Sequence, residues 1–233
     1  MVINLVIPVL SGHVGSASNI AEAISKNTDA IFVATSSTDV NAAFSVDTFA
    51  RENNLKIVNR DKIKAVSSKA IEGKPISLVI KNYPDDIDNA DVIITDDLID
   101  NPYGIVLAPK KYLVGIGLKK DKDLSSLENA LFKVLGDNNI DIADVYAVAS
   151  IDLKANEPGL KALSLKYRLP LIFYTKEMLN AVSGDFSDSD FVKETVGTGN
   201  VCERAVALLA GDSNKIIIKK QALNGVTIAV AVR

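Results

Sequence analysis

Strand-length apolar runs alternate with helix-like segments along the 233 residues, and this alternation limits the fold more than any other feature. The clearest run, at 145–149, is apolar at every position and leads directly into a charged turn at 150–159. A run of this kind is typical of a strand that is buried on both faces of a parallel sheet. Repeated alternation of strands and helices indicates an α/β fold.

We predict two α/β domains, at 1–109 and 110–233, because Pro109 separates two apolar runs and is followed by Lys110 and Lys111. For the C-terminal domain we predict three layers, α/β/α, around a mixed and mostly parallel sheet. For the N-terminal domain we predict a small sheet that is antiparallel in part. Its strands are the apolar runs at 76–80, 92–95 and 105–108, which acidic turns connect.

Two asparagines stand where helices are predicted to begin. Asn59 is predicted to cap a helix that ends near Ile71, and Asn156 is predicted to cap a helix that Pro158 opens. In this structural interpretation, 150–159 is simply a strand-to-helix loop, in which Glu157 interacts favourably with the helix dipole.

Composition excludes several classes of protein. The chain is 48% hydrophobic and 24% charged, and its apolar runs are far shorter than the roughly 20 residues of a membrane helix. The first residues lack the features of a signal peptide, so we expect a cytoplasmic protein. A single cysteine excludes an internal disulfide, and one histidine argues against a protein-built metal site. The net charge of -3 argues against a nucleic-acid partner.

The loop that contains Ser11, Gly12, His13 and Gly15 follows a predicted strand and precedes a predicted helix. Glycines let the backbone approach a ligand closely, and a helix N-terminus offers free N–H groups to an anion. His13 titrates near neutral pH and is a candidate general acid or base. The structural alternative, a tight turn whose histidine bonds a loop carbonyl, has equal weight.

Two Gly-x-Gly patterns, Gly115 with Gly117 and Gly197 with Gly199, resemble the start of a dinucleotide fingerprint but lack its third glycine. We interpret both as turns that present backbone N–H groups to an anion. The second precedes a helix predicted from Val201, so a carboxylate could bind there. A plain helix start is the alternative.

Lysine pairs follow predicted strands at 110–111, 119–120 and 219–220. If these strand ends converge, they form a basic rim for a polyanionic small molecule; otherwise they are solvated surface. Groups capable of proton transfer or ion pairing inside such a rim are Asp152, Lys154, Glu157 and Glu203.

Several ordered motifs are similar to those of the cobalt-precorrin-5A hydrolases of anaerobic cobalamin biosynthesis. In the first half these motifs lie at 7–15, 34–39, 44–47 and 50–53. In the second half they lie at 114–117, 149–154, 157–159, 169–171, 196–203 and 226–231. The resemblance covers the family's middle and C-terminal domains, and we expect the segment that usually precedes them to be largely absent.

The resemblance implies opening of the δ-lactone of cobalt-precorrin-5A and release of acetaldehyde to give cobalt-precorrin-5B. It implies no resident cofactor, because the corrinoid substrate carries its own cobalt. Other cobalamin-biosynthesis enzymes are expected partners, and a homodimer is an arrangement to test. The alternative is a non-catalytic corrinoid or tetrapyrrole carrier, because the C-terminal domain also resembles a small stand-alone protein of aerobic cobalamin synthesis. A nucleotide-binding enzyme is a third alternative.

We therefore expect the segments 115–117, 150–159 and 197–199 to meet at one edge of a sheet. The catalytic candidates are His13, Asp152 and Glu203. The candidates for substrate binding are Ser11, Gly12, Gly15, Gly115, Gly117, Lys119, Ser150, Lys154, Glu157, Gly197, Thr198, Gly199 and Asn200.

Overall fold

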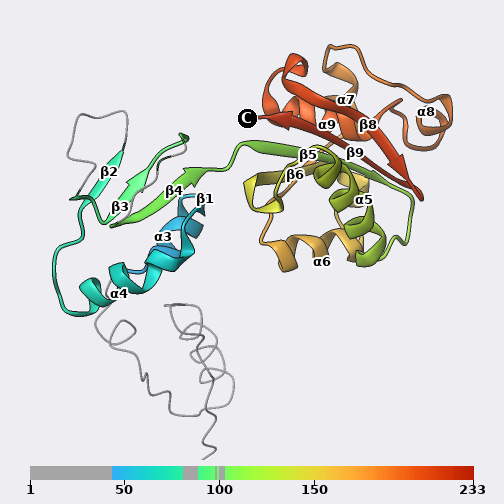
Figure 1. Ribbon diagram of the computed structural model, residues 1–233. Coiled ribbons are helices and arrows are strands. Elements are labelled where there is room, and N and C mark those ends of the chain that lie inside the picture. Colours follow the sequence, from blue (N-terminus) through green and yellow to red (C-terminus); the bar gives the residue numbers. More distant parts are fainter. Residues whose placement is uncertain (1–43, 81–88, 98, 100–102) are drawn as a thin grey trace, which may run out of the picture. The chain divides into compact units, whose positions relative to one another are not determined.

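The computed structural model describes residues 44–80, 89–97, 99 and 103–233. The chain divides into two compact units, Met1–Pro109 and Lys110–Arg233 (Figure 1). The loop at 11–15, with its four predicted site residues, lies outside the described residues. Within the described part of the chain, no helix has the length and apolar character that a membrane span requires.

The described sheet of the N-terminal unit has the order β1-β4-β3-β2. Its strands are β1 (Leu55–Ile57), β2 (Leu78–Ile80), β3 (Val92–Ile94) and β4 (Ile105–Pro109). The three strands predicted from the apolar runs, β2 to β4, are parallel to one another. The antiparallel pair is formed by β1 and β4, so the prediction placed the antiparallel contact in the wrong strands.

Two helices pack against one face of this sheet, α3 (Val46–Glu52) and α4 (Ile63–Ile71). Ser45 caps α3 by accepting a hydrogen bond from Thr48 N. Asn59 does not cap a helix as predicted. Its side chain instead donates to Gly104 O at 2.9 Å and accepts from Val106 N at 2.7 Å, because β4 lies beside it in the fold.

The C-terminal unit has a five-stranded sheet of order β7-β6-β5-β9-β8. Its strands are β5 (Tyr112–Leu118), β6 (Val145–Ile151), β7 (Leu171–Tyr174), β8 (Ile216–Leu223) and β9 (Val226–Val232). The β7-β6-β5 half is parallel, whereas β9 is antiparallel to both of its neighbours. The expected α/β class and mixed sheet are confirmed, and the parallel pairing is confined to one half.

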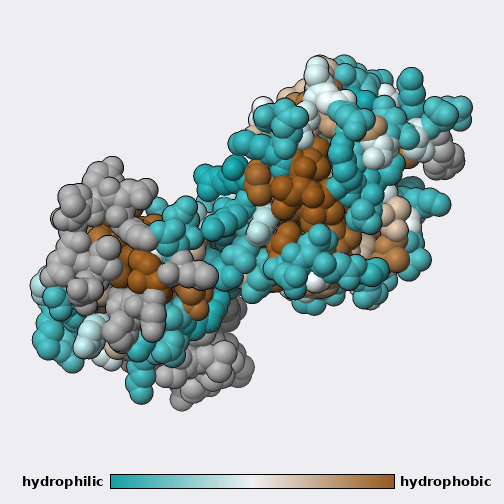
Figure 2. Space-filling view, turned by 45° about the horizontal axis from the view of Figure 1, so that its top comes forward, coloured by the Kyte–Doolittle hydropathy of each residue, from teal (hydrophilic) through white to brown (hydrophobic). Residues whose placement is uncertain are grey.

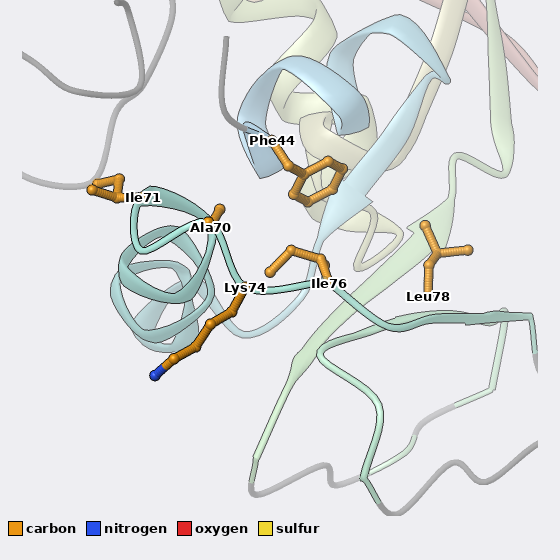
Figure 3. Close-up of a pocket in the computed structure, with 7 residues that line it drawn as sticks. Phe44, Ala70, Ile71, Lys74, Ile76 and Leu78 are labelled. Carbon is orange, nitrogen blue, oxygen red and sulfur yellow. The ribbon is translucent and has the colours of Figure 1, made fainter. Parts of the chain in front are cut away.

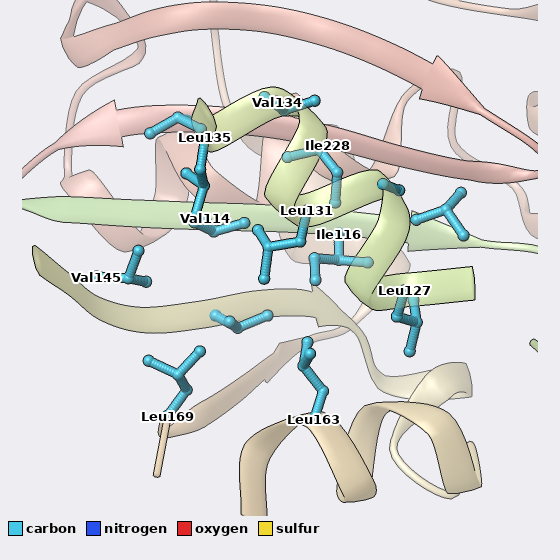
Figure 4. Close-up of a cluster of buried hydrophobic side chains, with 14 of the residues drawn as sticks. Val114, Ile116, Leu127, Leu131, Val134, Leu135, Val145, Leu163, Leu169 and Ile228 are labelled. Carbon is cyan, nitrogen blue, oxygen red and sulfur yellow. The ribbon is translucent and has the colours of Figure 1, made fainter. Parts of the chain in front are cut away.

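Helices cover both faces of this sheet. On one face, α5 (Leu124–Asp137) and α6 (Pro158–Tyr167) pack against alternate residues of β5, β6 and β9 (Figure 4). The other face is covered by α7 (Lys176–Ala181) and α9 (Val201–Ala210), with α8 (Asp190–Val196) beside them. Because both faces are covered, every residue of β6 except Tyr146 is buried. Figure 2 shows a hydrophobic area on this unit surrounded by hydrophilic residues.

The segment with Gly115 and Gly117 lies inside β5 and is not the predicted turn. A Cβ atom on Gly115 would lie 1.9 Å from Cys202 O of α9, and one on Gly117 would lie 2.5 Å from Thr227 Oγ1. The two glycines therefore let α9 and β9 approach β5 closely. Their role is packing, which the glycine spacing alone does not distinguish from ligand binding.

The start of α6 also differs from its prediction. Pro158 is the first helical residue, as predicted, but Glu157 occupies the cap position, and the carbonyl of the Asn156 side chain accepts from Lys161 Nζ. A Cβ atom on Gly159 would lie 2.2 Å from Lys122 O, so the helix begins in direct contact with the segment after β5.

Candidate functional site

A cavity of about 440 Å³ opens in the C-terminal unit at the carboxyl ends of β5 and β6. Ligands of open α/β sheets bind at this edge. The cavity is lined by Gly117, Leu118, Lys119, Lys120, Ile151, Lys154, Val192, Thr195, Val196, Gly199, Asn200, Val201, Lys220, Gly225 and Thr227. Segments that are distant in the sequence therefore meet here: the ends of β5 and β6, the β8–β9 turn and residues 192–201.

The described lining combines cations with an apolar wall. Four of its side chains are lysines, at 119, 120, 154 and 220, and none is a carboxylate. The apolar wall comes mainly from Ile151, Val192, Val196 and Val201. This arrangement suits a ligand with an apolar body and several anionic groups, because the lysines attract the charge and the aliphatic side chains contact the body.

The β8–β9 hairpin fixes one side of the cavity. Its turn contains Asn224 and Gly225, both with positive φ, as a tight hairpin turn requires. Gly225 O accepts a hydrogen bond from Lys119 N at 2.9 Å, and Thr227 Oγ1 donates to Gly117 O at 3.2 Å. The end of β5 and the hairpin therefore hold each other in register beside the cavity.

Glu157 lies behind the cavity and does not line it. Lys154 Nζ donates to Glu157 Oε1 at 2.7 Å, and both side chains are largely buried. Glu157 Oε2 accepts from Asp121 N at 3.1 Å. The hydrogen bond from Lys154 lowers the pKa of Glu157, so its carboxylate is ionised at neutral pH.

Glu203 is fully buried in α9 and is also absent from the lining. Its Oε1 accepts from Lys220 N at 2.6 Å and from Ser187 Oγ at 3.1 Å. Its Oε2 accepts from Ser187 N at 2.7 Å and from Asn200 Nδ2 at 2.9 Å. With four donors on one carboxylate, Glu203 connects α9, β8 and the segment that contains Ser187, so this geometry makes it a positioning group.

Asn200 lines the cavity and caps α9, since its Oδ1 accepts from Glu203 N at 3.0 Å. Gly197 ends α8 with a φ of 78°, and its N–H donates to Lys193 O. The N–H of Gly197, one of the backbone donors considered for a bound carboxylate, is therefore used within the protein. Thr198 is buried, and its hydroxyl has no hydrogen-bond partner in the structure.

The structure brings together part of the predicted constellation. Gly117, Lys119, Lys154, Gly199 and Asn200 all line the cavity. The other predicted residues of this unit do not line it, namely Gly115, Ser150, Asp152, Glu157, Gly197, Thr198 and Glu203.

Ser150 and Asp152 do not line the cavity, for different reasons. Ser150 is buried within β6, and its hydroxyl donates to Ile116 O at 2.7 Å. Asp152 is exposed in the turn after β6, where its Oδ1 accepts from Leu153 N at 2.7 Å. Neither side chain is placed to act inside the cavity in this conformation.

Sequence reasoning missed the contribution of α8. Val192, Thr195 and Val196 line the cavity from this helix, which was not predicted. Their i, i+3, i+4 spacing is the signal that could have indicated it. Lys120 and Lys220 were noticed only as members of lysine pairs, and nothing in their local sequence separates them from their neighbours.

The N-terminal unit has a different pocket, of about 740 Å³ (Figure 3). Its walls are mostly apolar, and its one charged side chain, Lys74, forms an exposed ion pair with Glu72. The lining residues are Phe44, Ala70, Ile71, Gly73, Lys74, Ile76 and Leu78. The C-terminal cavity therefore differs from this pocket in that four lysines line it, whereas one lysine lines the N-terminal pocket.

Comparison with known proteins matches both units. The family model described as cobalamin synthesis G C-terminus matches residues 112–231, and the cobalamin biosynthesis central region matches 44–112. A probable cobalt-precorrin-5A hydrolase of Methanocaldococcus jannaschii is 30% identical, over 97% of this chain and 73% of that protein. The cobalt-precorrin-5A hydrolase of Priestia megaterium is 27% identical, over 97% of this chain and 68% of that protein.

A crystal structure of CobE, described as a protein from the cobalamin (vitamin B12) biosynthetic pathway, is 27% identical in sequence. The match covers 52% of this chain and 89% of that one, with a TM-score of 0.47. The C-terminal model alone spans more than half of the chain, and the full-length relatives cover both units. The chain therefore belongs to the cobalt-precorrin-5A hydrolase family of cobalamin biosynthesis.

Proposed function

We propose that this chain hydrolyses the δ-lactone of cobalt-precorrin-5A and releases acetaldehyde, giving cobalt-precorrin-5B. One observation supports this function most strongly: four lysines and an apolar wall converge at the carboxyl ends of β5 and β6 in a member of this family. A corrinoid combines a broad apolar macrocycle with many peripheral carboxylates. The cavity of about 440 Å³ would hold an edge of the macrocycle with its acetate or propionate groups.

The reaction divides into two steps. In the first, water adds to the lactone carbonyl and the ring C–O bond breaks, leaving a carboxylate and an alcohol. In the second, the carbon that bears this alcohol leaves as acetaldehyde while the C–C bond breaks. The electron pair of that bond passes to the macrocycle, which takes up a proton. Cationic donors stabilise the oxyanion of the first step, and a base is needed to activate water.

Roles for this chain follow from the groups available. Lys119, Lys120, Lys154 and Lys220 bind carboxylates or the oxyanion, because they line the cavity. His13 is the proposed proton-transfer group, since an imidazole titrates near neutral pH. The substrate supplies its own cobalt, and no resident cofactor is proposed.

The test is incubation of the protein with cobalt-precorrin-5A, followed by an assay for acetaldehyde. We expect release from the wild-type protein. In a Lys119→Ala/Lys120→Ala variant we expect KM to rise by about tenfold with a smaller change in kcat, as for lost ground-state binding. Lys74→Ala, in the N-terminal pocket, is the matched control and should stay within about twofold. Absence of acetaldehyde with folded wild-type protein would refute the proposed activity.

The second candidate is a corrinoid carrier, because the sequence of Protein CobE, a shorter protein, matches only about half of this chain, 51%, at 26% identity. His13→Ala separates the two functions. Lost acetaldehyde release with corrinoid binding intact supports the hydrolase. Corrinoid binding by a wild-type protein that releases no acetaldehyde supports the carrier.

A further inference from the structure

The carboxylate of Glu157 connects two segments that carry cavity lysines. One oxygen accepts from Lys154 Nζ at 2.7 Å, and the other accepts from Asp121 N at 3.1 Å. Asp121 directly follows Lys119 and Lys120, which line the cavity, as Lys154 does. A single side chain therefore contacts both segments that supply three of the four cavity lysines.

The backbone at Asp121 needs such a partner. Its φ of 61° lies in the left-handed region, which is unfavourable for a residue other than glycine. An acceptor for its N–H helps to hold this conformation, and the conformation sets the direction in which the chain leaves β5. The path of the 119–120 segment therefore depends on a carboxylate that lies 36 residues further along the chain.

The ion pair also gives the cavity lysines different roles. Lys154 is 13% exposed and is neutralised by Glu157, which is 9% exposed, so it acts as an oriented hydrogen-bond donor. The ammonium of Lys220 donates to Ser187 O, a neutral partner. Net positive charge in the cavity therefore comes from Lys119, Lys120 and Lys220, at positions that depend on the surrounding loops.

We propose that Glu157 is a positioning residue of this cavity: it fixes the spacing of Lys119, Lys120 and Lys154, and that spacing selects ligands by the arrangement of their carboxylates. The selection of a corrinoid rests on the proposed function, whereas the positioning does not. Glu157 neither touches the ligand nor transfers a proton, because it lies behind Lys154. The size and charge of this one buried carboxylate would therefore determine which ligands fit the cavity.

The first test needs no ligand. In Glu157→Gln, we expect hydrogen exchange at the Asp121 amide to become at least about tenfold faster, since an amide side chain cannot accept from both partners. We expect acylation of Lys154, measured by mass spectrometry, to increase several-fold. Glu128→Gln is the matched control, because Glu128 accepts from Lys166 and Tyr167 away from the cavity. Unchanged exchange and acylation in Glu157→Gln would overturn the proposal.

A second variant separates charge from position. Glu157→Asp keeps the negative charge but is one methylene shorter, so it cannot span both partners. We expect its Asp121 exchange to resemble that of Glu157→Gln. If it resembles the wild type instead, charge alone is sufficient and the positioning role is wrong. Circular dichroism of each variant establishes that the fold is retained, and Glu157→Asp provides the measurement if Glu157→Gln does not fold.

The ligand arm uses cobyrinic acid, a corrinoid polycarboxylate, and acetate as a monocarboxylate. We expect Glu157→Gln and Glu157→Asp to weaken cobyrinic acid binding by about tenfold and to change acetate binding by less than about twofold. An equal loss for both probes contradicts selection by spacing. Failure of the wild type to bind cobyrinic acid refutes the proposed function, while the exchange and acylation results still decide the role of Glu157.

Discussion

The sheets of the two units differ in length and in what they hold at their ends. In the N-terminal unit, β1, β2 and β3 span three residues each, whereas β5, β6 and β9 of the C-terminal unit span seven each. The longer strands are covered on both faces, and the C-terminal unit also buries the carboxylates of Glu157 and Glu203. The comparison indicates that a lysine-lined cavity forms in the unit that is large enough to bury the carboxylates bonded to its lining.

The two pockets show the same difference. Lys74 in the N-terminal pocket pairs with an exposed glutamate two residues away. In the C-terminal unit, the side chain of Lys154 bonds to Glu157 and the backbone N–H of Lys220 bonds to Glu203. Both carboxylates are buried, and both accept from residues far away in the sequence. Exposed pairs contribute little, and buried charged groups are costly to disturb. Variants that disturb the buried contacts should therefore affect the C-terminal unit strongly.

The largest expected effect comes from Gly115→Val. A Cβ atom there would lie 1.9 Å from Cys202 O, so α9 must move away from β5. We expect the free energy of unfolding of the C-terminal unit to fall by about 3 kcal/mol or more. Urea unfolding followed by hydrogen exchange in each unit measures this loss.

Gly136→Ala is the matched control, because no atom lies within 4 Å of the added Cβ. It should be neutral or stabilising by up to about 1 kcal/mol, since alanine favours a helix. If Gly115→Val lowered the free energy of unfolding of both units equally, the C-terminal unit would not be stabilised by its own packing.

A smaller effect is expected from Glu203→Gln. The glutamine has one acceptor oxygen where four donors converge, so buried N–H groups lose their partners. We expect a loss of about 2–3 kcal/mol in the free energy of unfolding, measured by urea titration. Glu128→Gln, which removes one carboxylate oxygen at a partly exposed contact between α5 and α6, should cost about 1 kcal/mol or less. Similar losses for the two variants would show that Glu203 has no special structural role.

The smallest effect concerns pH. The hydrogen bond from Lys154 lowers the pKa of Glu157 below its ordinary value of 4.5, so the unfolded state binds more protons in acid. The stability that the pair contributes is present above pH 4.5 and is lost as pH falls through the lowered folded-state pKa. Urea unfolding should show a cost of about 1–2 kcal/mol for Glu157→Gln at pH 7, which decreases below about pH 4.5.

The exposed Lys74–Glu72 pair of the N-terminal unit supplies the contrast, because both side chains are more than half exposed. Glu72→Gln should change the free energy of unfolding by less than about 0.5 kcal/mol at each pH. A pH-dependent loss of equal size in both variants would remove the difference between the two units.

Much of the secondary structure was predictable because its signals are local. Thr175 caps α7 by accepting from Met178 N, and α5 follows from apolar residues at helical spacing. The basic cavity was predictable only as a convergence of strand ends, since the identity of the lining lysines depends on how the chain leaves each strand. Glu157 and Glu203 were predicted to face the ligand, because a charged residue near a strand end gives no indication of whether it points inward or outward.

The sequence by itself determined the α/β class, most of the C-terminal strands and helices, and the family, since each rests on local periodicity or on motifs at consistent spacing. Only the tertiary structure decided the roles of four residues. Gly115 lets α9 pack closely against β5, Asn59 bonds to Gly104 and to Val106 of β4, and Glu157 and Glu203 are buried outside the cavity lining. The physical reason is that the Asn59, Glu157 and Glu203 side chains bond to partners 16 to 47 residues away, and Gly115 lies against Cys202, which is still further along the chain. Such partners are chosen by packing, which no local pattern contains.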